Sequence, residues 1–392
     1  MVTTITLFWI SLFTLAYCYF GYGILLFLLN KTKRLFSFST KNKILEDPIP
    51  VTLIVAAYNE AAVLEAKIKN TLALHYSDLK IIFVTDGSTD DSEELIRRYP
   101  CITLLHHAER KGKFAAIRRA VQFVETPILV FSDANSMLNE DCIQKIALHY
   151  QDPIVGGVAG EKKIQHSSST IGEAESLYWK YESFMKKQDA DFNTVVGAAG
   201  ELFSIRTELF TEFDEDIILD DFIISMKICL QGYKIEYEPG AFAAETPSAS
   251  LADEEKRKVR ISSGAFQSVG YLSNALNFFK YPLLSFQYLS RRLLRWTVCP
   301  LLLAVLLLTN IFIVSYGSID LYKWTLVAQA FFYGTALLGY FFVRSGWKTG
   351  ILNVPFYFIF MNYCLIKGFF VYLNGSHTVL WKKSLRLQPT AE

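Results

Sequence analysis

The stretch PILVFSDAN, residues 127 to 135, joins a compact apolar run to one acid and one amide. Its first part has the length and the β-branched and aromatic content of a buried strand. Three similar runs precede it: VTLIVAA at 51 to 57, LKIIFVT at 79 to 85 and CITLLHH at 101 to 107. Helices are expected between these runs, near 60 to 74, 90 to 98 and 112 to 125. This alternation predicts an α/β fold with a mostly parallel sheet.

Polar loops follow the strand-like runs at their carboxyl ends, as YNE, DGSTDDS and SDANS. In sheets of this kind, ligands bind at that edge. Asp133 and Asn135 lie two residues apart in an extended segment, so their side chains point the same way. Two oxygen ligands suit a Mg²⁺ or Mn²⁺ ion that completes its shell with water and substrate phosphates. The alternative is an Asx turn that caps the helix expected near residue 139.

The composition indicates a membrane protein. The chain has 392 residues, of which 52% are hydrophobic and 15% aromatic, and its formal net charge is only +1. That balance argues against a nucleic-acid partner and against disorder. The apolar excess is concentrated in four segments: 5 to 30, 298 to 316, 324 to 343 and 351 to 373. Because about 20 apolar residues span the hydrocarbon core, we expect up to four spans, and the first is too long for a cleaved signal peptide.

Basic residues beside the apolar segments predict the orientation. KTKR at 31 to 34 and RRLLR at 291 to 295 favour the cytoplasmic side of the cell (inner) membrane for the region between them. Lys382, Lys383 and Arg386 favour the same side, although three further spans would leave the tail outside. The segment 351 to 373 is therefore a candidate for a re-entrant or interfacial element. Six cysteines without a C-x-x-C pair argue against a disulfide framework or a zinc site.

These features divide the chain into five predicted parts. Residues 274 to 296 mix aromatic, aliphatic and basic side chains, which predicts amphipathic interfacial helices anchored by Trp296 and the arginines. The parts are an N-terminal transmembrane helix with its basic flank (1–34), a cytosolic domain (45–270), interfacial helices (271–297), a C-terminal transmembrane region (298–373) and a tail (374–392).

Six motifs follow one another ahead of the clustered spans: VAAYNE, VTDGSTDDS, KGKFAAIRRA, FSDANS, LDDFIISMKICLQGY and RKVRI. In this order they resemble the membrane-bound family 2 glycosyltransferases, which include synthases of cellulose, hyaluronan, chitin oligosaccharide and poly-N-acetylglucosamine. The resemblance covers roughly residues 45 to 300. It implies a GT-A fold, a nucleotide-sugar donor of the UDP-sugar class, a Mg²⁺ or Mn²⁺ cofactor and inverting transfer to a glycan or lipid acceptor.

The resemblance also implies roles for residues of the donor site. Tyr58, Asn59 and Glu60 would line the nucleoside pocket, and Asp86 would accept a hydrogen bond from the base. Lys113, expected at a helix start, would meet the diphosphate together with the helix dipole. The alternatives are a packed ring for Tyr58, a turn acid for Asp86 and a solvated basic face around Lys113.

Further roles concern catalysis and the leaving group. Asp221 corresponds to the family's general base, and the like charge of Asp220 would raise its proton affinity. The alternative for this pair is capping of the following helix. The motif RKVRI matches four of five positions of the family's (Q/R)-x-x-R-W, so Arg257 and Arg260 would pair with the departing diphosphate.

The chain departs from the family pattern at two positions. Asp133 and Asn135 stand where the family has D-x-D, and the amide adds no negative charge for the metal. Ile261 stands where polymerising relatives have Trp, which weakens the expectation of a processive synthase. Trp179 is a candidate acceptor platform, or else a core tryptophan. The alternatives to polymer synthesis are single-sugar transfer to a lipid and a non-catalytic export or scaffold subunit, and a polymer synthase would need an export partner or a homo-oligomer.

Overall fold

The computed structural model describes residues 1–36, 47–165, 170–212, 216–345, 347 and 350–376. The predicted domain start at 45 and the tail beyond 376, with its basic residues, lie outside this range.

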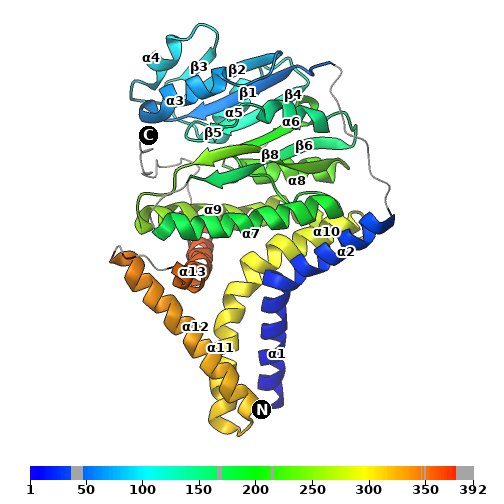
Figure 1. Ribbon diagram of the computed structural model, residues 1–392, viewed down its shortest axis with the longest axis vertical. Coiled ribbons are helices and arrows are strands. Elements are labelled where there is room, and N and C mark those ends of the chain that lie inside the picture. The colour runs from blue at the N-terminus through cyan, green and yellow to red at the C-terminus, as the bar shows by residue number, and fades with distance from the viewer. Residues whose placement is uncertain (37–46, 166–169, 213–215, 346, 348–349, 377–392) are drawn as a thin grey trace.

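One eight-stranded sheet forms the upper part of the molecule (Figure 1). Its strands are β1 (Val51–Ala57), β2 (Leu79–Asp86), β3 (Thr103–His107), β4 (Ile128–Asp133), β5 (Met137–Leu138), β6 (Val155–Ile164), β7 (Leu202–Arg206) and β8 (Lys234–Glu245). They are ordered β3-β2-β1-β4-β7-β6-β8-β5. The first four are mutually parallel, as are β6 and β8, whereas β7 is antiparallel to both neighbours and β5 to β8. The predicted α/β fold with a mostly parallel sheet is confirmed.

Helices cover both faces of the sheet, which explains why the central strands β1 and β4 are almost continuously apolar and buried. Alternate residues of β1 face opposite ways: Leu53 and Val55 belong to a core with α3 and α6, and Ile54 and Ala56 to a core with α5 and α8. The short helices of the domain are α3 (Ala61–Leu72), α4 (Ser92–Arg97), α5 (Lys113–Val121), α6 (Cys142–His149) and α8 (Asp220–Leu230). Helices were expected at the positions of α3, α4 and α5.

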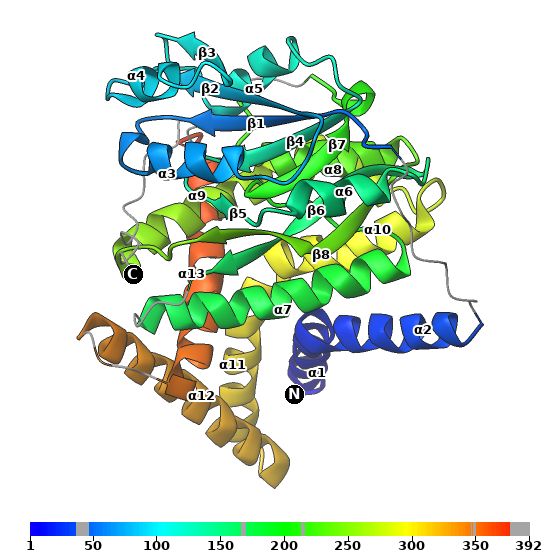
Figure 2. The same cartoon turned by 45° about the horizontal axis from the view of Figure 1, so that its top comes forward.

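Two long helices, α7 (Thr170–Phe192) and α9 (Leu251–Tyr271), lie between the sheet and the apolar helices (Figures 1 and 2). Several of their charged residues are buried, among them Glu182 and Asp189 of α7 and Glu254 of α9. Buried charges of this kind need partners, and the apolar helices supply some of them. This layer therefore connects the sheet domain to the membrane region.

The described residues contain four helical segments that are long and apolar enough to cross a membrane: Val2–Leu35, Pro282–Tyr316, Asp320–Arg344 and Asn353–Leu373. The first is not straight. A π-helical turn, Tyr17–Gly21, separates α1 (Val2–Ala16) from α2 (Tyr22–Phe36), and the two helices run in different directions (Figure 2). In α2, Tyr22 donates a hydrogen bond of 2.6 Å to Asp189 of α7, so this half of the first segment is bound to the middle layer.

The segment predicted to form interfacial helices continues into the next apolar helix. Helix α10 (Pro282–Tyr288) continues through a π-helical stretch, Leu289–Val298, into α11 (Cys299–Tyr316) as one long segment. Arg291 and Arg295 are buried and form ion pairs of 2.6 and 2.7 Å with Glu182. A buried carboxylate on α7 therefore holds these two arginines inside the protein, and anchoring of the chain at the membrane surface by this segment stays a prediction.

The last described helix, α13 (Asn353–Leu373), follows α12 (Asp320–Arg344) and packs against α7 and α9. A Cβ built on Gly368 would come within 2.4 Å of Ser262 Cβ in α9, so glycine permits a very close approach here. Lys367 forms a 2.6 Å ion pair with Glu255 of α9. The segment predicted at 351 to 373 is thus a helix with one face against the sheet domain.

Candidate active site

A cavity of about 1160 Å³ extends from the carboxyl edge of the sheet to the apolar helices. Its upper part is lined by the loops after β1 and β4 and by the start of α8, and its lower part by α7, α9 and α13. Because β1 and β4 are neighbours, with Ala56 paired to Asp133, their loops emerge side by side. The sheet topology therefore brings the predicted donor and metal residues to one place.

The predicted metal pair, Asp133 and Asn135, lines this cavity together with Lys113. Lys113 begins α5 and donates a 2.5 Å hydrogen bond to Asp133 Oδ1. Burial lowers the pKa of Lys113, but nearby carboxylates, led by Asp133 and Asp220, outweigh burial and hold it above its usual value. The described residues contain no cluster of three His, Cys, Asp or Glu for a metal. One carboxylate and one amide fit a Mg²⁺ or Mn²⁺ ion that takes its other ligands from water and phosphate.

A buried lysine, Lys67 of α3, supports the loop that carries Asp133. Its Nζ donates to Ser132 Oγ at 2.8 Å and to the carbonyl of Ser136 at 2.6 Å. Burial lowers the pKa of Lys67 to about 7. The sequence analysis missed this residue, although a lysine on the apolar face of a predicted helix was a usable signal.

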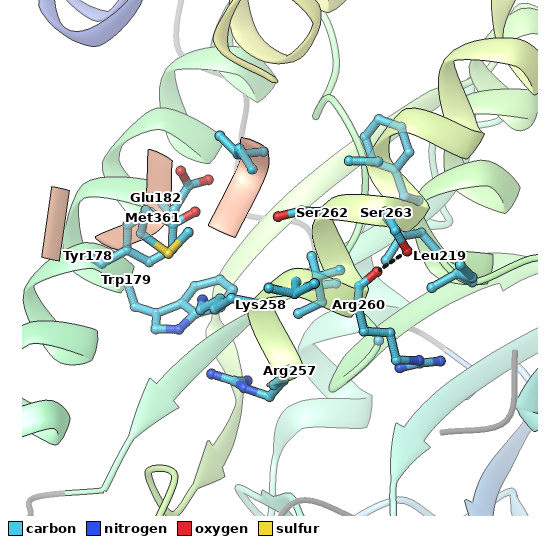
Figure 3. Close-up of a pocket in the computed structure, with 18 of the residues that line it drawn as sticks. Tyr178, Trp179, Glu182, Leu219, Arg257, Lys258, Arg260, Ser262, Ser263 and Met361 are labelled. Atoms are coloured by element: carbon cyan, nitrogen blue, oxygen red, sulfur yellow. Dashed lines mark hydrogen bonds between the residues drawn. The ribbon is translucent and has the colours of Figure 1, made fainter. Parts of the chain in front are cut away.

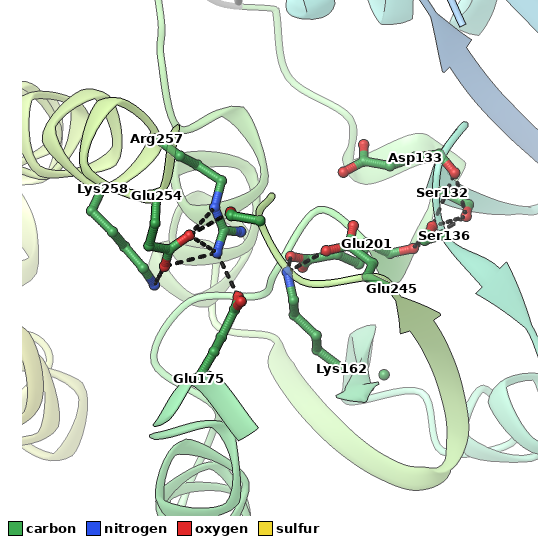
Figure 4. Close-up of polar contacts among 12 residues, drawn as sticks. Ser132, Asp133, Ser136, Lys162, Glu175, Glu201, Glu245, Glu254, Arg257 and Lys258 are labelled. Carbon is green, nitrogen blue, oxygen red and sulfur yellow. Dashed lines mark hydrogen bonds and ion pairs between the residues drawn. The ribbon is translucent and has the colours of Figure 1, made fainter. Parts of the chain in front are cut away.

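A second buried lysine, Lys162 of β6, lies between the carboxylates of Glu201 and Glu245 (Figure 4). The backbone carbonyl of Glu201 accepts hydrogen bonds from Ser132 and Ser136. These contacts join the loop that carries Asp133 and Asn135 to residues 197 to 201, the segment that faces Asp221. Neither Lys162 nor Glu201 was singled out from the sequence, because their partners lie far away in the chain.

The predicted base and its neighbour occupy the first turn of α8. Asp221 lines the cavity, and its Oδ1 accepts the backbone N–H of Phe222 at 2.8 Å. Asp220 is buried, and its Oδ2 has no hydrogen-bond partner among the described residues. Burial, followed by the charge of Asp220, raises the pKa of Asp221 to about 7. A carboxyl group with such a pKa can take a proton near neutral pH.

Gly200 lies between Lys113 and the predicted base, Asp221. A Cβ built on Gly200 would lie 3.0 Å from Lys113 Nζ and 3.2 Å from Asp221 Oδ2. We expect Gly200→Ala to displace one of these groups, at a cost of about 1–3 kcal/mol, and to lower kcat/KM roughly 10-fold or more. Steady-state kinetics measures this. Gly270→Ala is the matched control, because a Cβ there meets nothing within 4 Å, and an equal loss in both variants would contradict the expectation.

Both arginines of RKVRI line the cavity (Figure 3), but they differ in their partners. Arg260 lines the cavity, and its buried Nε has no hydrogen-bond partner among the described residues. Burial lowers its pKa, while the carboxylates of Asp220, Asp133 and Asp221 act against this shift. Arg257 instead donates to Glu175 at 2.5 Å and to Glu254 at 2.9 Å (Figure 4). Arg260 is thus available to an anion, whereas Arg257 is already neutralised by two carboxylates.

Of the four residues predicted to bind the nucleoside, only Tyr58 and Glu60 line the cavity. Tyr58 and Glu60 line the cavity, and the guanidinium carbon of Arg110 lies 3.6 Å from the Tyr58 ring centroid. Asn59 has φ of 51° and accepts the backbone N–H of Thr89 at 2.7 Å, so it ties the first loop to the second.

Asp86 is fully buried at the end of β2 and is absent from the cavity wall. Its Oδ2 accepts the backbone N–H groups of Lys111 and Gly112 at 3.0 and 2.6 Å. Those contacts fix the turn that leads into α5 and Lys113. Recognition of the base by Asp86 stays a prediction.

Trp179 projects from α7 toward the middle of the cavity (Figure 3). Its buried indole N–H has no acceptor among the described residues, and Lys162 Nζ lies 4.9 Å from its ring centroid. It faces the cavity and is not a closed core residue. Ile261 of α9 lines the same cavity and is 36% exposed.

Comparisons with known proteins agree with this geometry. Residues 52–213 match Glycosyl transferase family 2. The chain is 27% identical over 230 residues to a poly-beta-1,6-N-acetyl-D-glucosamine synthase of Staphylococcus aureus (strain COL), covering 55% of each. It is 23% identical over 225 residues to a Staphylococcus epidermidis protein of the same name, again covering 55% of each. The chain thus spans about half the length of these relatives.

A solved structure shares the fold. The mannosyltransferase PcManGT from Pyrobaculum calidifontis, in complex with GDP-Man and Mn²⁺, matches with a TM-score of 0.68 at 22% identity. The match covers 94% of this chain and 99% of the other. Residues 52–213 thus match a glycosyl transferase family 2 domain, and the described residues combine a GT-A-like α/β domain with four helices that are long and apolar enough to cross a membrane.

Proposed function

We propose that this protein transfers a sugar from a UDP-sugar to a hydroxyl group of a membrane-associated glycan or lipid acceptor, with inversion at the anomeric carbon. The observation that carries this proposal is the shared cavity: Asp221, Asp133 and Lys113 line one end of it, and α13 lines the other. A donor bound at the sheet edge and an acceptor arriving from the membrane side would meet at Asp221.

The donor diphosphate would lie among Lys113, Arg260, Asp133 and Asn135. Mg²⁺ or Mn²⁺ bound at Asp133 and Asn135 would neutralise charge on the leaving diphosphate. Lys113 is held by Asp133 at the start of a helix, where the backbone N–H groups also attract anions. Arg260 offers to the same region a buried Nε that has no hydrogen-bond partner in the described part of the chain. Preorganised positive charge of this kind stabilises the charge that develops as the donor bond breaks.

Asp221 would remove the proton of the acceptor hydroxyl as the oxygen attacks the anomeric carbon from the face opposite the diphosphate. Its raised pKa favours proton uptake. Asp220 would act by its charge, since it is the strongest electrostatic neighbour that raises the pKa of Asp221. Trp179 would stack against the acceptor, with its free N–H directed toward a sugar hydroxyl.

The cytoplasmic placement of the sheet domain is also part of the proposal, and it rests on the basic flanks of the apolar segments. The names of the staphylococcal relatives support polysaccharide synthesis. The replacement of Trp by Ile261 at the cavity wall favours a second candidate, transfer of a single sugar to a lipid. Four helices enclose little more than their own side chains, so a polymer product would need an export partner or an oligomer.

The proposal predicts metal-dependent turnover with one nucleotide sugar of a panel. Purified full-length protein in liposomes, given each radiolabelled donor with and without Mn²⁺, should release nucleoside diphosphate at least roughly tenfold faster with the metal. Product mass then separates a long glycan from one or two sugars on an extractable lipid. Absence of turnover and binding with every donor would contradict the proposal and favour a scaffold role.

A further inference from the structure

One carboxylate in the cavity wall has no role in the transfer reaction proposed above. Glu201 lines the cavity and directly follows Gly200, where a Cβ would lie 3.0 Å from Lys113 Nζ and 3.2 Å from Asp221 Oδ2. Burial is the main cause that raises the pKa of Asp133 and of Asp221, and the charge of Glu201 adds to the effect in both. Glu201 therefore lies close to the proposed metal ligand and to the proposed base.

The donor sugar would lie against the segment that contains Glu201. In the proposed reaction, the anomeric carbon is bonded to a diphosphate beside Lys113 and Asp133, and the attacking oxygen loses its proton to Asp221. The sugar ring is then placed between these groups, where residues 197 to 201 form the cavity wall. This segment reads GAAGE, so Glu201 supplies its only polar side chain. That side chain can meet the hydroxyl groups of the sugar.

Glu201 is held in place as an anion. Lys162 Nζ donates a hydrogen bond to Glu201 Oε1, and the backbone carbonyl of Glu201 accepts hydrogen bonds from Ser132 and Ser136. Burial raises the pKa of Glu201, but the charge of Lys162 outweighs burial and holds this pKa well below its usual value. The side chain is 15% exposed. Because an ionised carboxylate has about four acceptor positions, Glu201 can accept hydrogen bonds from a sugar in addition to that from Lys162.

The lysines around Glu201 do not cancel its charge. Lys162 also forms an ion pair of 2.6 Å with Glu245 (Figure 4). Lys186 of α7 lines the cavity, but its strongest electrostatic partner is Glu161. These five residues contribute two positive and three negative charges. This part of the wall is therefore negative even before the proposed base and its neighbour are counted.

The charge of the wall distinguishes between classes of sugar. A sugar with a carboxylate group would bring a like charge against Glu201, which is strongly unfavourable. Hydroxyl groups, in contrast, donate charge-assisted hydrogen bonds to a carboxylate. The wall thus favours an uncharged sugar with free hydroxyl groups.

We propose that Glu201 accepts hydrogen bonds from hydroxyl groups of the donor sugar and excludes donors whose sugar is a uronic acid. This proposal rests on the transfer reaction proposed above and names the class of its donor sugar. Glu201 is then a specificity-determining residue, separate from the groups that hold the diphosphate and from the base.

The test compares UDP-glucose with UDP-glucuronate, which differ only in a hydroxymethyl or a carboxylate group at C6. Calorimetry on full-length protein in detergent with Mn²⁺ measures both affinities. We expect wild type to bind UDP-glucose at least about tenfold more tightly than UDP-glucuronate, and Glu201→Gln to reduce this preference to about threefold or less. Glu201→Asp keeps the charge and should retain most of the preference. UDP lacks the donor sugar, so its affinity should stay within about twofold of wild type in both variants, which also shows that they are folded.

Glu245→Gln is the matched control, because Glu245 forms the other ion pair of Lys162 but is not among the described residues that line the cavity. This variant should change the preference less than about twofold. Four results would each overturn the proposal: equal affinities in wild type, an unchanged preference in Glu201→Gln, loss of the preference in Glu201→Asp, or an equal effect of Glu245→Gln. If wild type binds no UDP, the proposed function fails and this inference fails with it, whereas any of the four results with intact UDP binding counts against the inference alone.

Discussion

Asp221→Asn is expected to lower kcat by on the order of 10² to 10⁴ while leaving the affinity for the nucleotide within about threefold. The amide keeps the shape of the side chain and the contact with the N–H of Phe222, but it cannot take the proton of an acceptor hydroxyl. Single-turnover kinetics and UDP titration measure the two quantities. Asp191→Asn, an exposed acid at the end of α7, is the control. More than a tenth of wild-type activity in Asp221→Asn would show that the base is another group.

The pH dependence tests the same assignment. Since the pKa of Asp221 is raised to about 7, the rate should rise with pH and level off above about pH 7. Asp220→Asn removes the like charge and should move this inflection to lower pH. Folding favours the protonated form of a group whose pKa is raised, so the contribution of Asp221 to stability falls as pH rises through about 7. At pH 8.5, Asp221→Asn should therefore unfold at a temperature a few °C higher than wild type.

Asp133→Asn is expected to reduce kcat/KM by on the order of 10² to 10³. The substitution leaves two neutral amides where a metal ion needs charge, and it removes the carboxylate that holds Lys113 at 2.5 Å. Higher concentrations of Mn²⁺ should restore part of the activity, because the remaining oxygens still coordinate. A Mn²⁺ titration at fixed donor concentration measures both effects.

Asp141→Asn provides the matched control for this substitution. Asp141 is an exposed acid at the N-cap of α6, paired with Lys145 on the surface, and its loss should change neither kcat/KM nor the metal response. If Asp133→Asn behaves like Asp141→Asn at every metal concentration, Asp133 is not a metal ligand.

The parallel part of the sheet, β1 to β4, could be predicted because each of its strands is a short apolar run followed by polar residues. The run PILVFS is buried on both sides in β4, and the acids and amides that follow it were expected at the ligand edge. The resemblance of LDDF to a family motif predicted Asp221 as the base, and the structure places it in the cavity wall. These predictions depended on residues close together in the chain.

The buried ion pairs could not be predicted, because they join segments that are far apart in the chain. Lys162 pairs with Glu245 of another strand, and Arg291 with Glu182 more than a hundred residues away. Hydrophobic periodicity does not reveal such pairs. The arginines before α11 were therefore assigned to the membrane surface from the mixture of aromatic, aliphatic and basic side chains around them. Arg257 was expected at the diphosphate because RKVRI resembles a family motif, and only the position of Glu175 shows that its charge is already compensated.

The wall of the cavity is assembled from distant parts of the polypeptide: Tyr19 and Phe20 are made early, and α13, with Tyr357 and Met361, is made last among the described helices. A ribosome adds about 5–20 residues per second, so the sheet domain has several seconds to fold before α13 appears. During that interval the acceptor side of the cavity lacks one wall. The cavity is therefore complete only after α13 has joined a sheet domain that was synthesised before it.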